Sequence, residues 1–294
     1  MQFYIVDVFA ESKYSGNQLA IFLCDATTTG SEMQKIAAEM HFSESTFIVL
    51  DKKRPEGSQV RIFTPAHEVD FAGHPTLGTA YVIREKILRR PLEQVTLQLK
   101  VGPIPVHFPD GAAEPLWMDQ IQPIFGATLA ASALAEVLGL PLGAFAANYP
   151  IQEVSTGLPH IIVPLNSLEF LKKAKVDRAK YFRFIEKTWA KNILVFSRQP
   201  YAPGHDVSVR MFADYLGIPE DPATGSGNGC LGGYMVRHRY LDSSHISIRV
   251  GQGHEIGRPS LLFLRAEERH GSIRIEVGGK VAEIAAGHWP QSDL

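Results

Sequence analysis

The chain has 294 residues, of which 45% are hydrophobic, and a formal net charge of −2. A chain of this length can bury two globular cores, and its nearly balanced charge gives no basic footprint for nucleic acid. Cys24 and Cys230 are too few for a disulfide framework, and no apolar run approaches the roughly twenty residues of a membrane span. We therefore expect a cytoplasmic protein that binds neither nucleic acid nor membranes.

Hydrophobic periodicity and turn residues predict alternating strands and helices in the first half. Residues 46–50 are mostly apolar, which is typical of a buried strand, and residues 31–40 carry apolar side chains at helical spacing. The basic run Lys52-Lys53-Arg54 is interpreted as a solvated turn. The predicted order is a hairpin of residues 3–9 and 19–23, a helix at 31–40, strands at 46–50 and 60–63, a helix from 73 to about 86, and strands at 95–99 and 104–108.

The second half repeats these kinds of element in nearly the same order after Pro109-Asp110-Gly111. Residues 207–212 alternate apolar and polar, as a half-buried strand does. We predict two pseudo-equivalent α+β lobes, residues 1–115 and 116–294, with the option that the last strands return to the first lobe, and an active site in the cleft between the lobes. The predicted elements are a helix at 129–138, a hairpin of 151–156 and 161–165, a helix near 181–189, strands at 193–196 and 207–212, a helix after Asp221, and strands at 246–250, 260–264 and 273–277.

Two polar turns follow similar strands and open helices. Phe63 precedes Ala72 by nine positions, just as Phe212 precedes Asp221. The second turn, residues 220–229, is rich in Gly, Ser and Thr, so that its unpaired backbone N–H groups and the helix dipole can bind a carboxylate or phosphate. The alternative is an ordinary capped helix, because Asp221 can serve as an N-cap, as a ligand-binding carboxylate, or as both.

Two further side chains are candidates for acid–base chemistry. Glu44 is predicted at a helix-to-strand junction beside an apolar wall formed by Phe47, which suits a proton-transferring carboxylate; the alternative is a surface glutamate. His74 lies at a helix N-terminus, where the dipole should lower its pKa and favour the neutral ring; the alternative is a structural histidine packed in the turn. His67 and His74 lack metal-ligand spacing, so we expect no metal site.

Five spaced motifs together resemble the PhzF isomerase family of phenazine biosynthesis, over nearly the whole chain. They are Ser-Glu-Ser-Thr-Phe at 43–47, Phe-Thr-Pro and then Phe-Ala-Gly-His-Pro within 63–75, Gly-Leu-Pro-His at 157–160, Glu-Asp-Pro-Ala-Thr-Gly-Ser at 220–226 and Gly-Arg-Pro-Ser at 257–260. The resemblance implies the diaminopimelate-epimerase-like fold, in which each lobe is a curled sheet around a central helix, and commonly a homodimer.

The resemblance also implies a chemistry and its residues. Glu44 would transfer the proton, with His74 and Asp221 as further catalytic residues and with Gly73, Gly225 and Ser226 binding a small carboxylate-bearing substrate. The family's type substrate is trans-2,3-dihydro-3-hydroxyanthranilate, in which one glutamate can move a proton between two ring carbons on one face. No organic cofactor or metal is required.

Two alternatives stay open. Epimerases of the wider fold use a cysteine in each lobe, but neither polar turn here carries a thiol in its motif and Cys230 lies in the following helix, so two-thiol racemisation is disfavoured. An epimerase or other isomerase of a small amino or hydroxy acid could instead pair Glu44 with Asp221 or His74. A non-catalytic small-anion-binding or interaction protein could retain the same fold.

Overall fold

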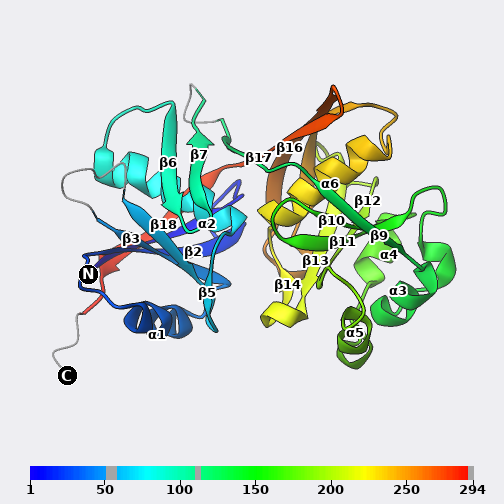
Figure 1. Cartoon of the computed structure of the whole chain (residues 1–294), viewed down its shortest axis with the longest axis horizontal. Coiled ribbons are helices and arrows are strands. Elements are labelled where there is room, and N and C mark those ends of the chain that lie inside the picture. The colour runs from blue at the N-terminus through cyan, green and yellow to red at the C-terminus, as the bar shows by residue number, and fades with distance from the viewer. Residues whose placement is uncertain (51–57, 110–113, 291–294) are drawn as a thin grey trace. The chain divides into compact units, whose positions relative to one another are not determined.

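The computed structural model describes residues 1–50, 58–109 and 114–290. Its chain forms two compact units, Met1–Asp119 with Gly278–Leu294, and Gln120–Val277 (Figure 1). The basic run predicted as a turn, Lys52-Lys53-Arg54, lies outside the described residues, as do Asp110 and Gly111. Within the described ranges, no helix combines the length and the apolar character that a membrane crossing needs.

The first unit wraps its strands around one buried helix, α2 (Gly73–Val82). All but one of the α2 side chains are buried, because small and apolar residues cover every face of this helix. A Cβ atom at Gly78 would lie 2.7 Å from Leu19 Cδ2, so that glycine lets the helix approach the sheet closely. The other elements are β1 (Gln2–Val8), β2 (Asn17–Cys24), α1 (Gly30–Met40), β3 (Glu44–Val49), β4 (Gln59–Phe63), β5 (Glu68–Val69), a π-helical extension of α2 (Ile83–Leu88), β6 (Gln94–Leu99), β7 (Gly102–His107), β8 (Leu116–Asp119) and β18 (Val281–His288).

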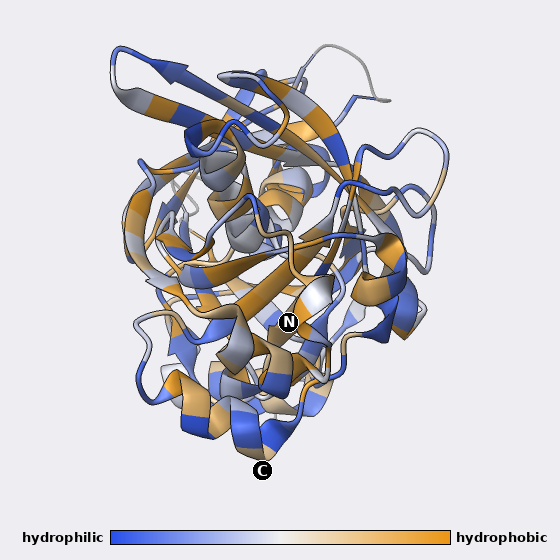
Figure 2. Cartoon of the chain, turned by 90° about the vertical axis from the view of Figure 1, so that its right-hand side faces the viewer, coloured by the Kyte–Doolittle hydropathy of each residue, from blue (hydrophilic) through white to orange (hydrophobic). Residues whose placement is uncertain are grey.

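The second unit is built around α6 (Gly225–Arg237), whose residues are buried from Gly225 to Val236. A second apolar cluster fills the opposite side of its sheet, where α3, α4 and α5 cover Ile193, Val195 and Phe212. Figure 2 shows the hydrophobic strands inside this unit and hydrophilic turns on its helices. The remaining elements are β9 (Ile124–Leu129), α3 (Ala131–Leu138), a 3-10 turn (Leu142–Ala144), β10 (Ile151–Ser155), β11 (Pro159–Leu165), α4 (Leu168–Lys173), α5 (Arg178–Ile185), β12 (Asn192–Ser197), β13 (Val207–Ala213), a 3-10 turn (Asp214–Leu216), β14 (Ile218–Asp221), β15 (His245–Gln252), a 3-10 turn (His254–Ile256), β16 (Ser260–Arg269) and β17 (Ser272–Gly279).

The strand pairings of the second unit repeat those of the first. Strands β2 and β3 are parallel, as are β11 and β12. Strands β3 and β4 are antiparallel, as are β12 and β13, and short β5 and β14 pair antiparallel with β4 and β13 before each central helix. Strand β18 completes the first unit beside β1, whereas β9 lies beside β10. The prediction of two pseudo-equivalent α+β lobes is confirmed.

An arginine–glutamate pair recurs at equivalent places in the two units. Arg61 on β4 binds Glu68 through two hydrogen bonds of 2.7 Å, and Arg210 on β13 binds Glu220 through bonds of 2.9 and 2.7 Å. Each guanidinium also lies over the phenylalanine two residues further on, at 5.1 Å for Phe63 and 4.9 Å for Phe212. Each pair therefore fixes the short strand that leads into a central helix.

Several local predictions were wrong. Residues 207–212 form a fully buried strand, because the polar side chains of Ser208 and Arg210 find hydrogen-bond partners inside the protein. The helix expected from residue 129 begins at Ala131, since Ile124–Leu129 forms strand β9. The equal nine-residue spacing does not mark equivalent positions either, because Glu68 and Glu220 each lie four residues before the helix N-caps, Ala72 and Thr224.

Candidate active site

Glu44 and His74 meet in the first unit. Glu44 is the first residue of β3, and His74 is the second residue of α2. Glu44 Oε2 lies 3.6 Å from His74 Nε2, with 15% of the glutamate side chain and 5% of the histidine side chain exposed. The fold therefore brings together the two side chains that the sequence marked as candidates for proton transfer.

The wall beside Glu44 is not the predicted one. Successive side chains of a strand point to opposite faces, so Glu44 and Phe47 point apart. Phe47 packs in the cluster that α1 covers and stacks on Phe22 at 5.1 Å. Thr46 shares the face of Glu44, and its Oγ1 lies 2.8 Å from Oγ1 of Thr79 on α2. Glu44 thus faces the central helix rather than the aromatic cluster.

His74 is held in its neutral form. Burial lowers the pKa of His74 to about 3, opposed only in part by a hydrogen bond to the backbone of Gln18. The predicted direction is right, but desolvation is the main cause, where the helix dipole was expected. Nε2 has no hydrogen-bond partner within the described residues, so the bond to Gln18 uses Nδ1–H. Nε2 then presents a lone pair to Glu44 and can accept a proton but not donate one.

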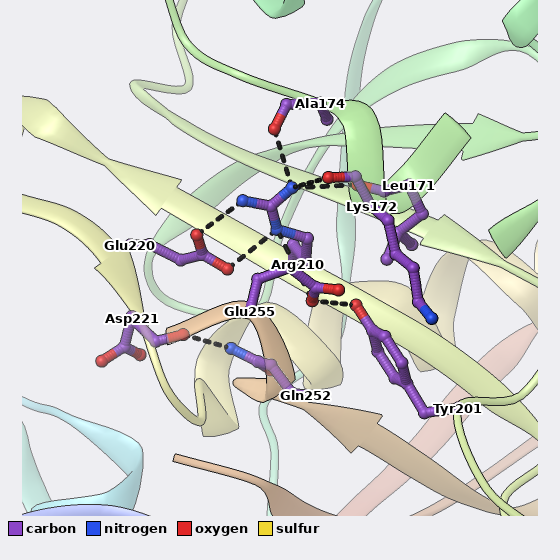
Figure 3. A network of polar contacts seen from close by, with 9 residues as sticks. All are labelled: Leu171, Lys172, Ala174, Tyr201, Arg210, Glu220, Asp221, Gln252 and Glu255. Atoms are coloured by element: carbon purple, nitrogen blue, oxygen red, sulfur yellow. Dashed lines mark hydrogen bonds and ion pairs between the residues drawn. The ribbon is translucent and has the colours of Figure 1, made fainter. Parts of the chain in front are cut away.

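Asp221, Gly225 and Ser226 gather at the start of α6 in the second unit. Asp221 ends β14 and is buried, and it is not the N-cap, because Thr224 takes that position. Thr224 Oγ1 donates a hydrogen bond of 2.5 Å to Asp221 Oδ2. Beside this turn, Arg210 joins Glu220 to the carbonyl oxygens at the end of α4 (Figure 3). Asp221 is therefore a fixed carboxylate directly before the helix.

The two central helices begin without a side-chain cap. The side chains of the N-cap residues, Ala72 before α2 and Thr224 before α6, accept no hydrogen bond from the backbone of the first turn. Thr29, Ser167 and Asp177 cap α1, α4 and α5, whereas α3, which follows Ala130, also has no side-chain cap. An uncapped first turn has backbone N–H groups available for an anionic group. Gly73 opens α2, and Gly225 with Ser226 opens α6, which places the predicted binding residues at these two turns.

The thiol nearest the second turn is unsuited to proton abstraction. Cys230 is buried in α6, with its Sγ 3.6 Å from Thr156 Oγ1 and 3.7 Å from His160 Nδ1. Burial raises the pKa of Cys230 to about 11, so the group is a neutral thiol at physiological pH. His160 cannot ionise it, because burial lowers the pKa of this histidine to about 4. Over the ranges described, no group of three or more potential ligand side chains is placed to hold a metal ion.

The buried histidines predict how stability depends on pH. An unfolded histidine has a pKa near 6.5. Below that pH, His74 and His160 are protonated in the unfolded state but stay neutral in the folded state. The free energy of unfolding should therefore fall as the pH is lowered from 6.5 towards 4, by up to about 1.4 kcal/mol per pH unit for each histidine. Urea titrations at pH 7, 6 and 5 measure this slope.

The control for this prediction exchanges one histidine at a time. His160→Gln can keep the hydrogen bond to the Leu158 carbonyl. It should reduce the slope of the unfolding free energy against pH by the contribution of one histidine, whereas replacing exposed His245 by Gln should leave the slope unchanged. Equal slopes for the wild type and His160→Gln would show that His160 is not held neutral by burial.

Sequence reasoning missed the residues that fix Asp221. Gln252 and Asn228 are fully buried, and both hydrogen-bond to the turn that begins α6. The run Gly251-Gln252-Gly253, at the end of a strand and just before Gly-Arg-Pro-Ser, was a signal for Gln252. Asn228 lies within the recognised polar turn and was interpreted only as part of a helix start.

Comparisons with known proteins agree with this architecture. The model of the family described as phenazine biosynthesis-like protein, PhzC-PhzF, matches residues 6–287. Trans-2,3-dihydro-3-hydroxyanthranilate isomerase of Pseudomonas aeruginosa is 32% identical over 289 residues, covering 97% of this chain and 98% of that protein. The crystal structure of a PhzF-family phenazine biosynthesis protein from Bacillus anthracis superposes with a TM-score of 0.87 at 26% identity and covers 98% of each chain. A probable proline racemase from Agrobacterium radiobacter K84 shares the fold alone, with a TM-score of 0.60 at 10% identity over 99% of this chain and 93% of that one.

Proposed function

Because the chain belongs to the phenazine biosynthesis-like PhzC-PhzF family and is an isomerase, we propose that it moves a proton within a small carboxylic acid that carries an amino or hydroxyl group. The supporting observation is that Glu44 and His74 form an acid–base pair that the second unit lacks. Strand β12, the counterpart of β3, begins with Asn192, and Ser226 occupies the position in α6 that His74 occupies in α2. An amide and a hydroxyl do not exchange protons as a carboxylate does, so the arrangement favours one base over two.

In the proposed reaction, Glu44 removes and returns the same proton. Its carboxylate takes a proton from a carbon next to an unsaturated system. The electron pair of the broken C–H bond forms a new double bond, and the existing π electrons shift towards the carbon that will accept the proton. The protonated Glu44 then delivers the proton to a different carbon, so no atom is gained or lost. Neutral His74 accepts a hydrogen bond at Nε2 and thereby orients the carboxyl group while it carries the proton.

The binding groups act on the polar parts of the substrate. We assign Gly73 in the first unit, and Gly225 with Ser226 in the second, to substrate binding, because each helix start has backbone N–H groups that suit an anionic group. We assign Asp221 to the binding of an amino or hydroxyl group of the substrate, which can donate a hydrogen bond to a fixed carboxylate.

From the family resemblance we also propose that the protein is a homodimer, which light scattering of the purified protein tests. We propose that it acts in the cytoplasm, where its two free cysteines would stay reduced.

Isotope exchange tests the reaction with trans-2,3-dihydro-3-hydroxyanthranilate, the substrate named in the relative from Pseudomonas aeruginosa. In heavy water a single-base shift should place mostly protium on the accepting carbon, because Glu44 is largely buried and returns the proton it removed. Proton NMR of the product, quenched at early turnover, measures this. Full deuterium at an inverted carbon would identify a two-base epimerase instead, and no turnover of this acid would rule it out as the substrate.

A further inference from the structure

The amide of Gln252 is fully committed in the interior of the second unit. Its Nε2 donates to the Asp221 carbonyl oxygen at 2.9 Å and to Thr224 Oγ1 at 3.0 Å. Its Oε1 accepts from Asn228 Nδ2 at 3.0 Å and from the Thr224 backbone N–H at 3.4 Å. Both hydrogens and both lone pairs of the amide are used, so the orientation of Gln252 is fixed. Figure 3 shows its contact with Asp221.

This orientation sets the direction of the next hydrogen bond. Thr224 Oγ1 receives a hydrogen from Gln252, so its own single hydrogen is directed to Asp221 Oδ2, 2.5 Å away. The result is a chain of donors from Gln252 through Thr224 to the Asp221 carboxylate. A hydroxyl that donates to a carboxylate stabilises its ionised form.

Several charged groups near the turn bind one another. Arg210 is engaged by Glu220, whose side chain leaves β14 on the opposite face from Asp221 (Figure 3). Three further titratable groups face Tyr201: Glu255 bonds to its hydroxyl, His254 stacks on its ring at 4.1 Å, and Lys172 lies 5.7 Å from the ring centre. The donor chain therefore reaches Asp221 from the side of α6 and β15, away from these charges.

We propose that Gln252 and Thr224 are positioning residues that keep Asp221 ionised and in one orientation, so that Asp221 binds a hydrogen-bond donor of the substrate and does not itself transfer the proton. The assignment of Asp221 to substrate binding rests on the proposed function. The donor chain itself is a property of the free protein and can be measured without turnover.

Carbon-13 NMR of the aspartate carboxyl groups tests the chain, with the Asp221 signal assigned from Asp221→Asn. Thr224→Val keeps the shape but removes the donor, so the midpoint of the Asp221 titration should move to higher pH by about one pH unit. Gln252→Glu should move it in the same direction, because a carboxylate cannot donate to Thr224. Thr224→Ser retains the hydroxyl and should restore the wild-type midpoint.

Thr188→Val is the matched control. It also removes a buried hydroxyl that donates a hydrogen bond, here to the Ala190 carbonyl oxygen, but this hydroxyl is not part of the chain that leads to Asp221. An Asp221 midpoint that stays at its wild-type value in both Thr224→Val and Gln252→Glu would overturn the donor chain.

With trans-2,3-dihydro-3-hydroxyanthranilate, Thr224→Val should raise KM about tenfold and change kcat less than threefold. A loss confined to kcat would overturn the binding role of Asp221. Absence of turnover in the wild type would count against the proposed function and leave the NMR result standing.

Discussion

Replacing Glu44 by glutamine should reduce kcat by roughly two to four orders of magnitude while binding is largely kept. The amide has nearly the shape of the carboxyl group and can still hydrogen-bond beside His74, but it cannot take up and return a proton. The measurements are the turnover of trans-2,3-dihydro-3-hydroxyanthranilate and calorimetric binding of its stable aromatic analogue, 3-hydroxyanthranilate.

Glu39→Gln is the control for this loss, because it removes an exposed carboxylate from α1 in the same unit. It should retain the wild-type kcat. If Glu44→Gln turned over the substrate near the wild-type rate, another group would have to carry the proton. If it lost binding of the analogue as well, Glu44 would hold the substrate rather than react with it.

Replacing Arg210 by leucine should lower the free energy of unfolding by about 3–5 kcal/mol. The side chains of Arg210 and Glu220 are only 9% and 10% exposed, so removal of the cation leaves a buried carboxylate unpaired. The carbonyl oxygens of Leu171, Lys172 and Ala174 lose their donor at the same time. Urea unfolding monitored by circular dichroism measures the change.

The first unit supplies the matched control for Arg210. Arg61→Leu breaks the equivalent pair with Glu68, but these side chains are 27% and 30% exposed and solvent can replace the lost contact. Its cost should be about 1 kcal/mol or less. Adding Glu220→Gln to Arg210→Leu should recover part of the loss, because the unpaired charge is then gone. Equal costs at Arg61 and Arg210 would contradict the role assigned to burial.

The sequence predicted the elements better than it predicted the surroundings of the candidate residues. Motif order marked Glu44 and His74 as candidates, but no local pattern shows that Glu44 Oε2 at a strand start and His74 Nε2 at a helix start lie 3.6 Å apart. Strand geometry alone excludes Phe47 as the apolar wall beside Glu44. Phe47 lies three positions from Glu44, so its side chain must point to the other face of the strand. The role of Gln252 was harder to predict, because the hydrogen-bond partners of a buried amide are known only once the fold is known.

The duplication also explains why sequence spacing misled. Both units place an arginine–glutamate pair before the central helix, but the second unit inserts the 3-10 turn Asp214–Leu216 between the two strands that carry the pair. Counting from Phe63 and Phe212 therefore matches Ala72 with Asp221, whereas the helix starts match Ala72 with Thr224. Elements recur reliably in a duplicated fold, and loop lengths between them do not.

Strand β18 has a consequence for how the chain folds as it is synthesised. It pairs with β1 along Gln2–Val8, so the first unit needs a strand from residues 281–288. The Gln120–Val277 unit, in contrast, is continuous in sequence. On the ribosome, the segment made second can complete its fold first, while the earlier segment waits with one side of β1 unpaired. That open strand edge can pair with other chains until β18 emerges, so the period of greatest aggregation risk falls late in translation.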